Sequence, residues 1–256
     1  MAASAIPALP ENSQLAFVGE DAWPPAVITE RQAEMFRAAA NPTGRANSDV
    51  LLGFLRLERG QFATRWQIDF SPHLTEQEAS VYQAPFKHLT KKLGADLGKS
   101  GLVNPGAKPS LRSGLARLDR FLVARHDEAA PRWIWIDAGW LPDASLVAVA
   151  RDDDFSHGVL QSRAFLAWWS AVAPEAGAAA AIESFPFPWP VRTAYGALTG
   201  IQQDMRFEIA RAARNSDRER LDAMVGTAYG FPPQIDDPEL LLRLQRLNRR
   251  RSGREI

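Results

Sequence analysis

The spacing of hydrophobic and polar residues changes along the chain, and each spacing predicts a different element. At residues 15–19, 65–70 and 146–150, apolar residues alternate with polar ones or form short runs, which predicts β-strands. Residues 120–126 and 132–137 are two more β-prone runs. The short segment joining them ends in Pro131, so together they predict a hairpin.

Helical spacing follows capping signals. Thr29 with Gln32 and Thr75 with Glu78 are capping-box patterns, and Pro85 must interrupt the second of these helices. Residues 94–114 lack any period and predict a loop. The remaining helices are predicted from apolar stripes: Phe165, Trp168, Trp169 and Val172 after the acidic residues 152–154; Leu198, Ile201, Met205 and Ile209; Leu221, Met224, Val225 and Ala228 after a capping box at Ser216; and Leu240, Leu241, Leu244 and Leu247 after Asp237.

This order of elements predicts an α+β fold, with a mixed α/β domain over residues 13–173. An extended segment and a helical C-terminal region follow over residues 174–256. The boundary is placed at residues 174–190, which are rich in Ala, Gly and Pro. Two aromatic groups are interpreted as structural: Trp133 and Trp135 as one face of a buried sheet, and residues 185–190 as an extended strap over the protein's own core.

Composition narrows the class of protein. The 256 residues carry no cysteine, which excludes disulfides, thiolate nucleophiles and cysteine-bound zinc. No apolar run approaches the roughly 18 residues of a membrane span, and the first residues are not basic, so neither a membrane helix nor a secretory signal is expected. The expected location is therefore the cytoplasm.

The net charge is zero, but the charges are sorted along the chain. Residues 86–132 hold ten Lys and Arg against four Asp and Glu, a local surplus of six positive charges. Clustered cations on one face can bind phosphates, and loop-borne Arg and Lys can reach base edges. The DNA-binding candidates are Lys87, Lys91, Lys92, Lys99, Lys108, Arg112, Arg117, Arg125 and Arg132, although a solvated surface is the plainer explanation of such a run.

No catalytic, cofactor-binding or metal-binding residue is predicted. Residues 94–100 resemble a phosphate-binding loop, but the glycines are one residue too close and a helix precedes them. Residues 152–154 could bind a divalent cation, yet acidic residues before a helix more often cap it. The four histidines are far apart, and a methyltransferase's glycine-rich loop and Asn/Asp-Pro-Pro-aromatic motif are missing.

Several motifs, in order, resemble the C-terminal target-recognition region of fused restriction–DNA adenine methyltransferase enzymes of types IIG and IIL. The strongest are the strand at 145–151 with its acidic turn, "GVLQSR" at 158–163 and "ESFPFPWP" at 183–190. The others are "FVG" at 17–19 with "WPP" at 23–25, "ANSDVL" at 46–51, "RWQIDF" at 65–70, "YQAPFK" at 82–87 and "AYGFP" at 228–232. The resemblance covers the chain from about Ser13 to Pro232.

There are also departures from the family. The nuclease and methyltransferase domains that would precede this region are not in the sequence, and residues 94–118, where base-reading segments vary, are short. The asparagine-glycine expected after "DVL" is replaced by residues 56–60. Because the base-contacting positions are the variable ones, the resemblance assigns none of them here.

The resemblance implies a DNA-binding specificity module for restriction–modification and phage defence. It would bind double-stranded DNA while a methyltransferase partner or further domain supplies S-adenosylmethionine chemistry, with no cofactor in this chain. Two alternatives stay open. The chain could be an interaction subunit or relic that docks to a methyltransferase or other defence-system partner without binding DNA. It could also be a hydrolase built on residues 152–154, which metal-dependent stabilisation would reveal.

Overall fold

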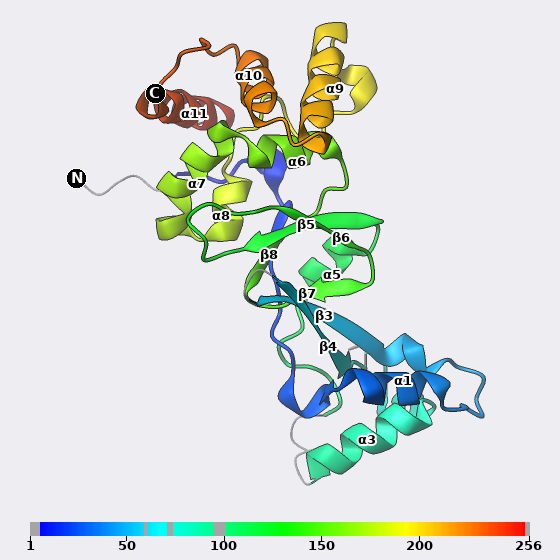
Figure 1. Cartoon of the computed structure of the whole chain (residues 1–256). Coiled ribbons are helices and arrows are strands. Elements are labelled where there is room, and N and C mark those ends of the chain that lie inside the picture. The colour runs from blue at the N-terminus through cyan, green and yellow to red at the C-terminus, as the bar shows by residue number, and fades with distance from the viewer. Residues whose placement is uncertain (1–5, 59–60, 71–73, 95–100, 254–256) are drawn as a thin grey trace. The chain divides into compact units, whose positions relative to one another are not determined.

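The structure, a computed structural model, describes residues 6–58, 61–70, 74–94 and 101–253. The chain forms two compact units, shown in Figure 1. The large unit contains Met1–Val18, Gly114–Ala138 and Val147–Ile256, and the small unit contains Gly19–Ser113 and Gly139–Leu146. Each is built on its own four-stranded sheet with helices around it, so the predicted α+β class is confirmed.

The sheet of the small unit has the strand order β2-β4-β3-β7. Its strands are β2 (Val27–Ile28), β3 (Leu51–Glu58), β4 (Gln61–Ile68) and β7 (Trp140–Pro142). β3 and β4 pair antiparallel from Leu51↔Ile68 to Glu58↔Gln61, whereas β7 joins β3 in parallel. The predicted strand at 65–70 is therefore the second half of a long hairpin.

The small unit contains the helices α1 (Glu30–Ala38), α2 (Glu76–Ser80) and α3 (Gln83–Leu93), together with all but the last two residues of α5 (Pro109–Leu115). Both predicted capping boxes are present, at Thr29 and Thr75. Pro85 lies in the first turn of α3, where a missing N–H is tolerated. The predicted interruption of the helix therefore falls before Pro85, between the end of α2 and the start of α3. The loop prediction for 94–114 is wrong at its end, where α5 starts at Pro109, a residue favoured at the first position of a helix, and buries Leu111.

The sheet of the large unit has the order β1-β8-β5-β6. Its strands are β1 (Ala16–Val18), β5 (Arg120–Arg125), β6 (Ile134–Asp137) and β8 (Leu146–Val149). β5 and β6 pair antiparallel, which confirms the predicted hairpin. Every residue of β8 is buried, as its continuous apolar run requires.

The large unit's helices are α6 (Asp154–Gln161), α7 (Arg163–Ala176), α8 (Ala178–Glu183), α9 (Gly200–Arg214), α10 (Arg218–Tyr229) and α11 (Asp237–Arg251). α6 packs closely on α9 through Gly158: a Cβ atom there would lie 2.9 Å from Ile209 Cγ2. The helix expected after the acidic turn is in fact two, because Ser162 ends α6 and also caps α7.

Aromatic side chains fill the core of the large unit. Phe165, Trp168 and Trp169 of α7 are buried against Phe185 and Phe187. Residues 185–190 therefore lie as a strap over the unit's own core, as predicted, and Trp133 faces the same core. The predicted division at residue 173/174 does not coincide with the two compact units, since α7 continues through Pro174 and both sides share this core.

Two helical predictions need correction. The predicted apolar stripe includes Ile201, which is 69% exposed, whereas Ile209 in α9 and Leu198 just before it are buried. The cap of α10 is Asp217 rather than Ser216, whose backbone takes a positive φ of 54°. Among the described residues, no helix is long and apolar enough to cross a membrane.

Candidate nucleic-acid interface

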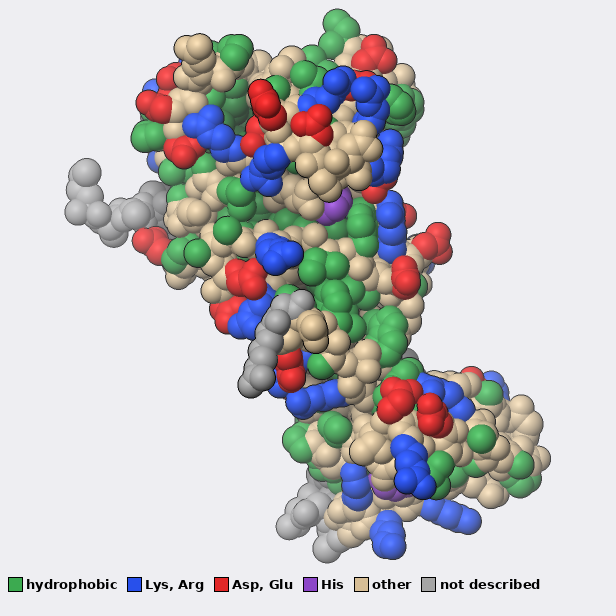
Figure 2. All heavy atoms as spheres, in the orientation of Figure 1, with side chains coloured by type: hydrophobic (Ala, Val, Ile, Leu, Met, Phe, Trp, Pro, Cys, Tyr) green, Lys and Arg blue, Asp and Glu red, His purple; other side chains and the backbone are tan. Residues whose placement is uncertain are grey.

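The basic side chains of α3 are exposed members of the predicted DNA-binding set. Leu89 and Leu93 bury one side of the helix, which leaves Lys87 and Lys91, one turn apart, exposed. Lys92 is also exposed, but its Nζ donates to the Val27 carbonyl at 2.9 Å. Figure 2 shows basic side chains projecting over this part of the small unit. The lysine pair is therefore available to an anion.

His88 lies on the same helix and adds no charge to it at neutral pH. Burial, followed by the neighbouring Lys92 and Lys91, lowers the pKa of His88 below its ordinary value. Its ring packs edge-on against Phe36 at 5.3 Å, and its Nε2 is buried without a hydrogen-bond partner in the described part of the chain. The positive charge of α3 comes from its lysines alone.

Arg112 is engaged in a buried ion-pair cluster in the small unit. Its guanidinium donates to Glu20 Oε1 at 2.5 Å and to Asp69 Oδ2 at 2.6 Å, with further bonds at 3.2 Å to each carboxylate. Burial alone would lower the pKa of Arg112, but these hydrogen bonds and charges outweigh it and raise the pKa. With four N–H groups used, Arg112 has little capacity left for a phosphate.

The other predicted cations are divided between the units. In the small unit, Lys108 donates from Nζ to the Gly19 carbonyl at 2.7 Å. In the large unit, Arg125 pairs with Asp127 at 2.6 Å, while Arg117 and Arg132 are exposed. Lys99, with the phosphate-loop-like stretch around it, lies outside the described residues. The structure thus separates accessible cations from those already bonded within the protein.

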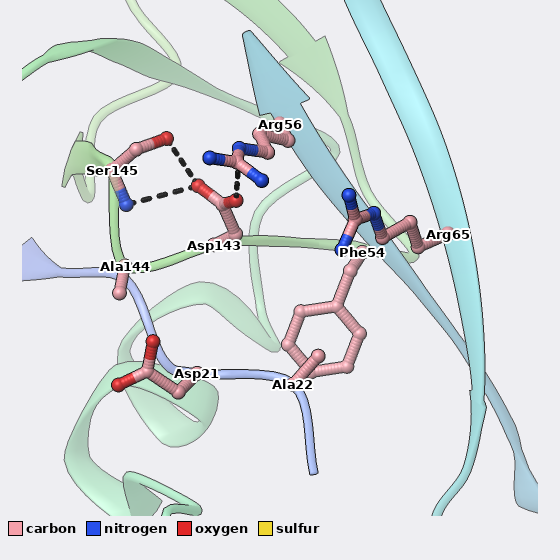
Figure 3. A pocket seen from close by; sticks show the side chains of 8 residues that line it. All are labelled: Asp21, Ala22, Phe54, Arg56, Arg65, Asp143, Ala144 and Ser145. Carbon is pink, nitrogen blue, oxygen red and sulfur yellow. Dashed lines mark hydrogen bonds and ion pairs between the residues drawn. The ribbon is translucent and has the colours of Figure 1, made fainter. Parts of the chain in front are cut away.

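A polar hollow of about 230 Å³ lies beside the β3–β4 hairpin in the small unit (Figure 3). Arg56 and Arg65 line it from neighbouring strands, and both are partly exposed. The remaining lining residues are Asp21, Ala22, Phe54, Asp143, Ala144 and Ser145. Asp143 forms an ion pair with Arg56, with Nε and Oδ2 3.3 Å apart, and accepts a hydrogen bond from the Ser145 backbone N–H at 2.9 Å.

The hollow combines donors and acceptors of the kinds that recognise base edges. An arginine fork matches the O6 and N7 acceptors of guanine, and a carboxylate accepts from cytosine N4. Arg65, which has Glu58 at 3.6 Å as its ion-pair partner, is half exposed. The sequence does not predict this hollow, because three segments that are distant in sequence meet there. The alternation at 65–70 did place Arg65 on the opposite strand face from Trp66, and that was the available signal.

The acidic turn before α6 has a structural role. Asp153 caps the helix, accepting from the Ser156 N–H at 3.0 Å, which confirms the capping interpretation. Two arginines hold each carboxylate: Arg151 at 2.6 Å and Arg206 at 3.4 Å on Asp153, and Arg120 at 2.9 Å and Arg214 at 2.8 Å on Asp154. Burial would raise the pKa of Asp153, but Arg151 and the bonds from Ser156 hold it below its ordinary value.

We expect His157, in the first turns of α6, to make the large unit sensitive to mild acid. Burial lowers the pKa of His157, although a backbone hydrogen bond at Trp133 and the charge of Asp154 oppose the shift. As pH falls, His157 is therefore protonated in the unfolded chain before it is protonated in the folded one. The folded state loses stability as pH falls from about 6.5, the pKa in the unfolded chain, towards the lower pKa in the folded protein. Asp153 does not contribute in this window, because its stabilisation is lost only as pH falls below the carboxylate's unfolded value of about 4.

We expect the melting temperature to be lower at pH about 5.5 than at pH about 7.5, and the difference to shrink in His157→Gln. Scanning calorimetry at both pH values measures this. His126→Gln is the control, since His126 is an exposed histidine in the same unit. An equal pH difference in the wild type and His157→Gln would show that His157 does not cause it.

Comparison with known proteins gives a likeness of fold. No family profile matches the sequence, and no curated protein matches it. A solved structure of the Type IIL restriction-modification enzyme MmeI in complex with DNA is similar, with a TM-score of 0.61 at 12% identity. The likeness covers 98% of this chain and 36% of that one, so the chain spans about a third of the enzyme's length. At 12% identity, this likeness shows that this chain and the matching part of the enzyme have related folds.

Proposed function

We propose that this chain is a DNA-binding target-recognition module that works with, or as part of, a DNA methyltransferase or restriction enzyme. One observation carries the proposal: nearly the whole chain, 98%, has the fold of part of a restriction-modification enzyme solved with DNA. The type IIG/IIL resemblance of the ordered sequence motifs supports the same assignment. In this proposal, a partner or further domain binds S-adenosylmethionine, and the chain acts in phage defence in the cytoplasm.

The exposed lysines of α3 would contact phosphates, while the hollow beside the β3–β4 hairpin would read bases. Phosphate contacts supply affinity but no sequence information, whereas base-edge contacts supply specificity. Lys87 and Lys91 suit the first task because they are exposed and flexible. Arg65 suits the second because a guanidinium fork matches a base edge.

DNA binding is tested by fluorescence anisotropy of a labelled mixed-sequence duplex across a salt series. With six or more phosphate contacts, affinity should fall by roughly 10³-fold or more between about 50 and 200 mM salt. A steep slope supports the module and justifies selecting a preferred site from a randomised duplex library. Absence of binding at low salt would reject the proposal for the isolated chain.

Arg65→Ala is expected to relax specificity at one base position of the selected site. The variant should lose about 1 to 3 kcal/mol on the preferred duplex and little on mixed-sequence DNA, because one base contact is removed. Competition anisotropy with single-base variants of the site measures both. Arg45→Ala, an exposed arginine of the same unit, is the control. If Arg65→Ala keeps the wild-type base preference at every position of the selected site, the hollow does not read bases.

A second candidate function is docking to a methyltransferase or other defence-system partner without DNA contact. It is favoured by three large apolar side chains that are exposed on α9 and on the short turn before it: Tyr195 at 56%, Ile201 at 69% and Phe207 at 56%. Co-purification with a methyltransferase, together with no salt-sensitive DNA binding, would select this function over the first.

A further inference from the structure

The last helix of the large unit carries arginines that the fold itself does not use. Arg246, Arg249 and Arg250 are exposed on α11, near the C-terminal end of the described chain. Their spacing of i, i+3 and i+4 puts them on one face of the helix. None of the three has an ion pair in the described structure, whereas Arg243, one turn earlier, pairs with Glu239 at 2.6 Å.

The opposite face holds α11 in place. Leu240 and Leu244 are buried in the large unit's core. Asn248 is buried too, and its amide donates to the carbonyls of Pro7 at 2.9 Å and Ser184 at 2.6 Å. Arg251 donates to two carbonyls of the strap, Phe187 at 2.6 Å and Pro188 at 3.0 Å. The arginine face, defined as Arg246, Arg249 and Arg250, is therefore displayed on a fixed helix.

The surplus of charge here is local. The chain as a whole has 30 basic and 30 acidic residues. Apart from exposed arginines such as Arg117 and Arg132, many arginines of the large unit are paired: Arg151 and Arg206 with Asp153, Arg120 and Arg214 with Asp154, Arg220 with Glu208 and Arg163 with Asp237. Basic residues in a last helical turn do interact favourably with the helix dipole. That effect fades within one turn and is weak at exposed positions, so it does not account for Arg246.

We infer that the arginine face of α11 is a second contact for the phosphate backbone of duplex DNA, separate from the lysines of α3. Guanidinium groups bind phosphates through paired N–H donors. Leu242, at 45%, lies one turn before Arg246 on the same face and is the one large apolar side chain of α11 exposed in the described structure, whereas a typical protein interface has a larger apolar centre. The inference rests on the proposed function and adds a contact from the large unit to it.

The test uses the full chain carrying Arg246→Ala, Arg249→Ala and Arg250→Ala together. Each lost phosphate contact should reduce the magnitude of the salt slope by about 0.9. Loss of all three corresponds to roughly a hundredfold weaker binding or more at about 0.1 M salt, on every sequence alike. Sequence preference should stay the same, because phosphate contacts carry none.

Arg243→Ala is the matched control. It removes one positive charge from the same helix, as each single substitution of the triple variant does, but from a side chain already paired with Glu239. We expect its salt slope to equal that of the wild type. Because all four positions are at the helix surface, melting temperatures should change little, and calorimetry checks this.

The outcomes separate this inference from the proposed function. A wild-type chain that does not bind DNA at low salt overturns both. If the wild type binds with a steep salt slope and the triple variant has the same slope, only the inference is overturned. The arginine face would then be a contact for an acidic protein surface. A slope reduced in the triple variant but not in Arg243→Ala supports it.

Discussion

Arg112→Met is expected to destabilise the small unit by roughly 3 to 5 kcal/mol. Glu20 is fully buried, and two of its partners are the Arg112 guanidinium, at 2.5 Å, and the Lys108 N–H, at 2.8 Å. Methionine keeps most of the side-chain volume but removes the charge, so a buried carboxylate is left without its counter-ion. Removing one partner of such a pair costs more than the pair itself contributes. Urea unfolding followed by tryptophan fluorescence measures the loss.

Two further variants show whether charge is the cause. Glu20→Gln removes the buried charge, so the double variant Glu20→Gln/Arg112→Met should lose less stability than the sum of the single variants. Arg117→Ala, at an exposed position, should change stability by no more than about 0.5 kcal/mol. If Arg112→Met is as stable as Arg117→Ala, the cluster does not hold the unit together.

This prediction also changes how a DNA-binding defect at Arg112 is interpreted. Charge alone placed Arg112 among the candidate phosphate contacts, beside Lys91 and Lys92. In the structure its guanidinium joins Glu20 and Asp69, which come from segments distant in sequence. Weaker DNA binding in an Arg112 variant would therefore report damage to the small unit. A phosphate contact is better tested at side chains that are free of such bonds.

Local signals in the sequence were enough for most elements. The capping boxes at Thr29 and Thr75 and the hairpin of β5 and β6 depend on neighbouring residues, and they lie where the sequence predicts them. The strap was also predictable, because alternating Phe and Pro cannot form a helix and must still bury its rings. The prediction of α5 failed because a helix of seven residues shows little hydrophobic periodicity, so Pro109 at its start was the one local signal.

The candidate site was less predictable, because its parts come from different segments. Charge counting found Lys87 and Lys91 but could not tell them from Arg112, since a sequence does not reveal which cation meets a buried carboxylate. It also passed over Arg56 and Arg65, whose shared hollow exists only once β3 and β4 pair. The unpaired arginines of α11 were missed for a related reason: their availability depends on which other arginines find partners.

Lys87→Glu with Lys91→Glu is expected to weaken DNA binding on every sequence, because both side chains are exposed on one face of α3. Each lost phosphate contact should reduce the salt slope by about one, so the pair should cost roughly a hundredfold in affinity at about 0.1 M salt. The reversed charges add repulsion to that loss. Anisotropy titrations across a salt series, with preferred and mixed-sequence duplexes, measure both quantities.

Arg31→Glu tests whether net charge alone explains such a loss. Arg31 is an exposed cation on α1 of the same unit, so a single Lys91→Glu and Arg31→Glu change the total charge equally. If α3 contacts DNA phosphates, Lys91→Glu should lower the salt slope more than Arg31→Glu does. Equal, small effects would mean that the chain's DNA affinity does not depend on α3. The unpaired arginines of α11 would then be the first place to look for its phosphate contacts.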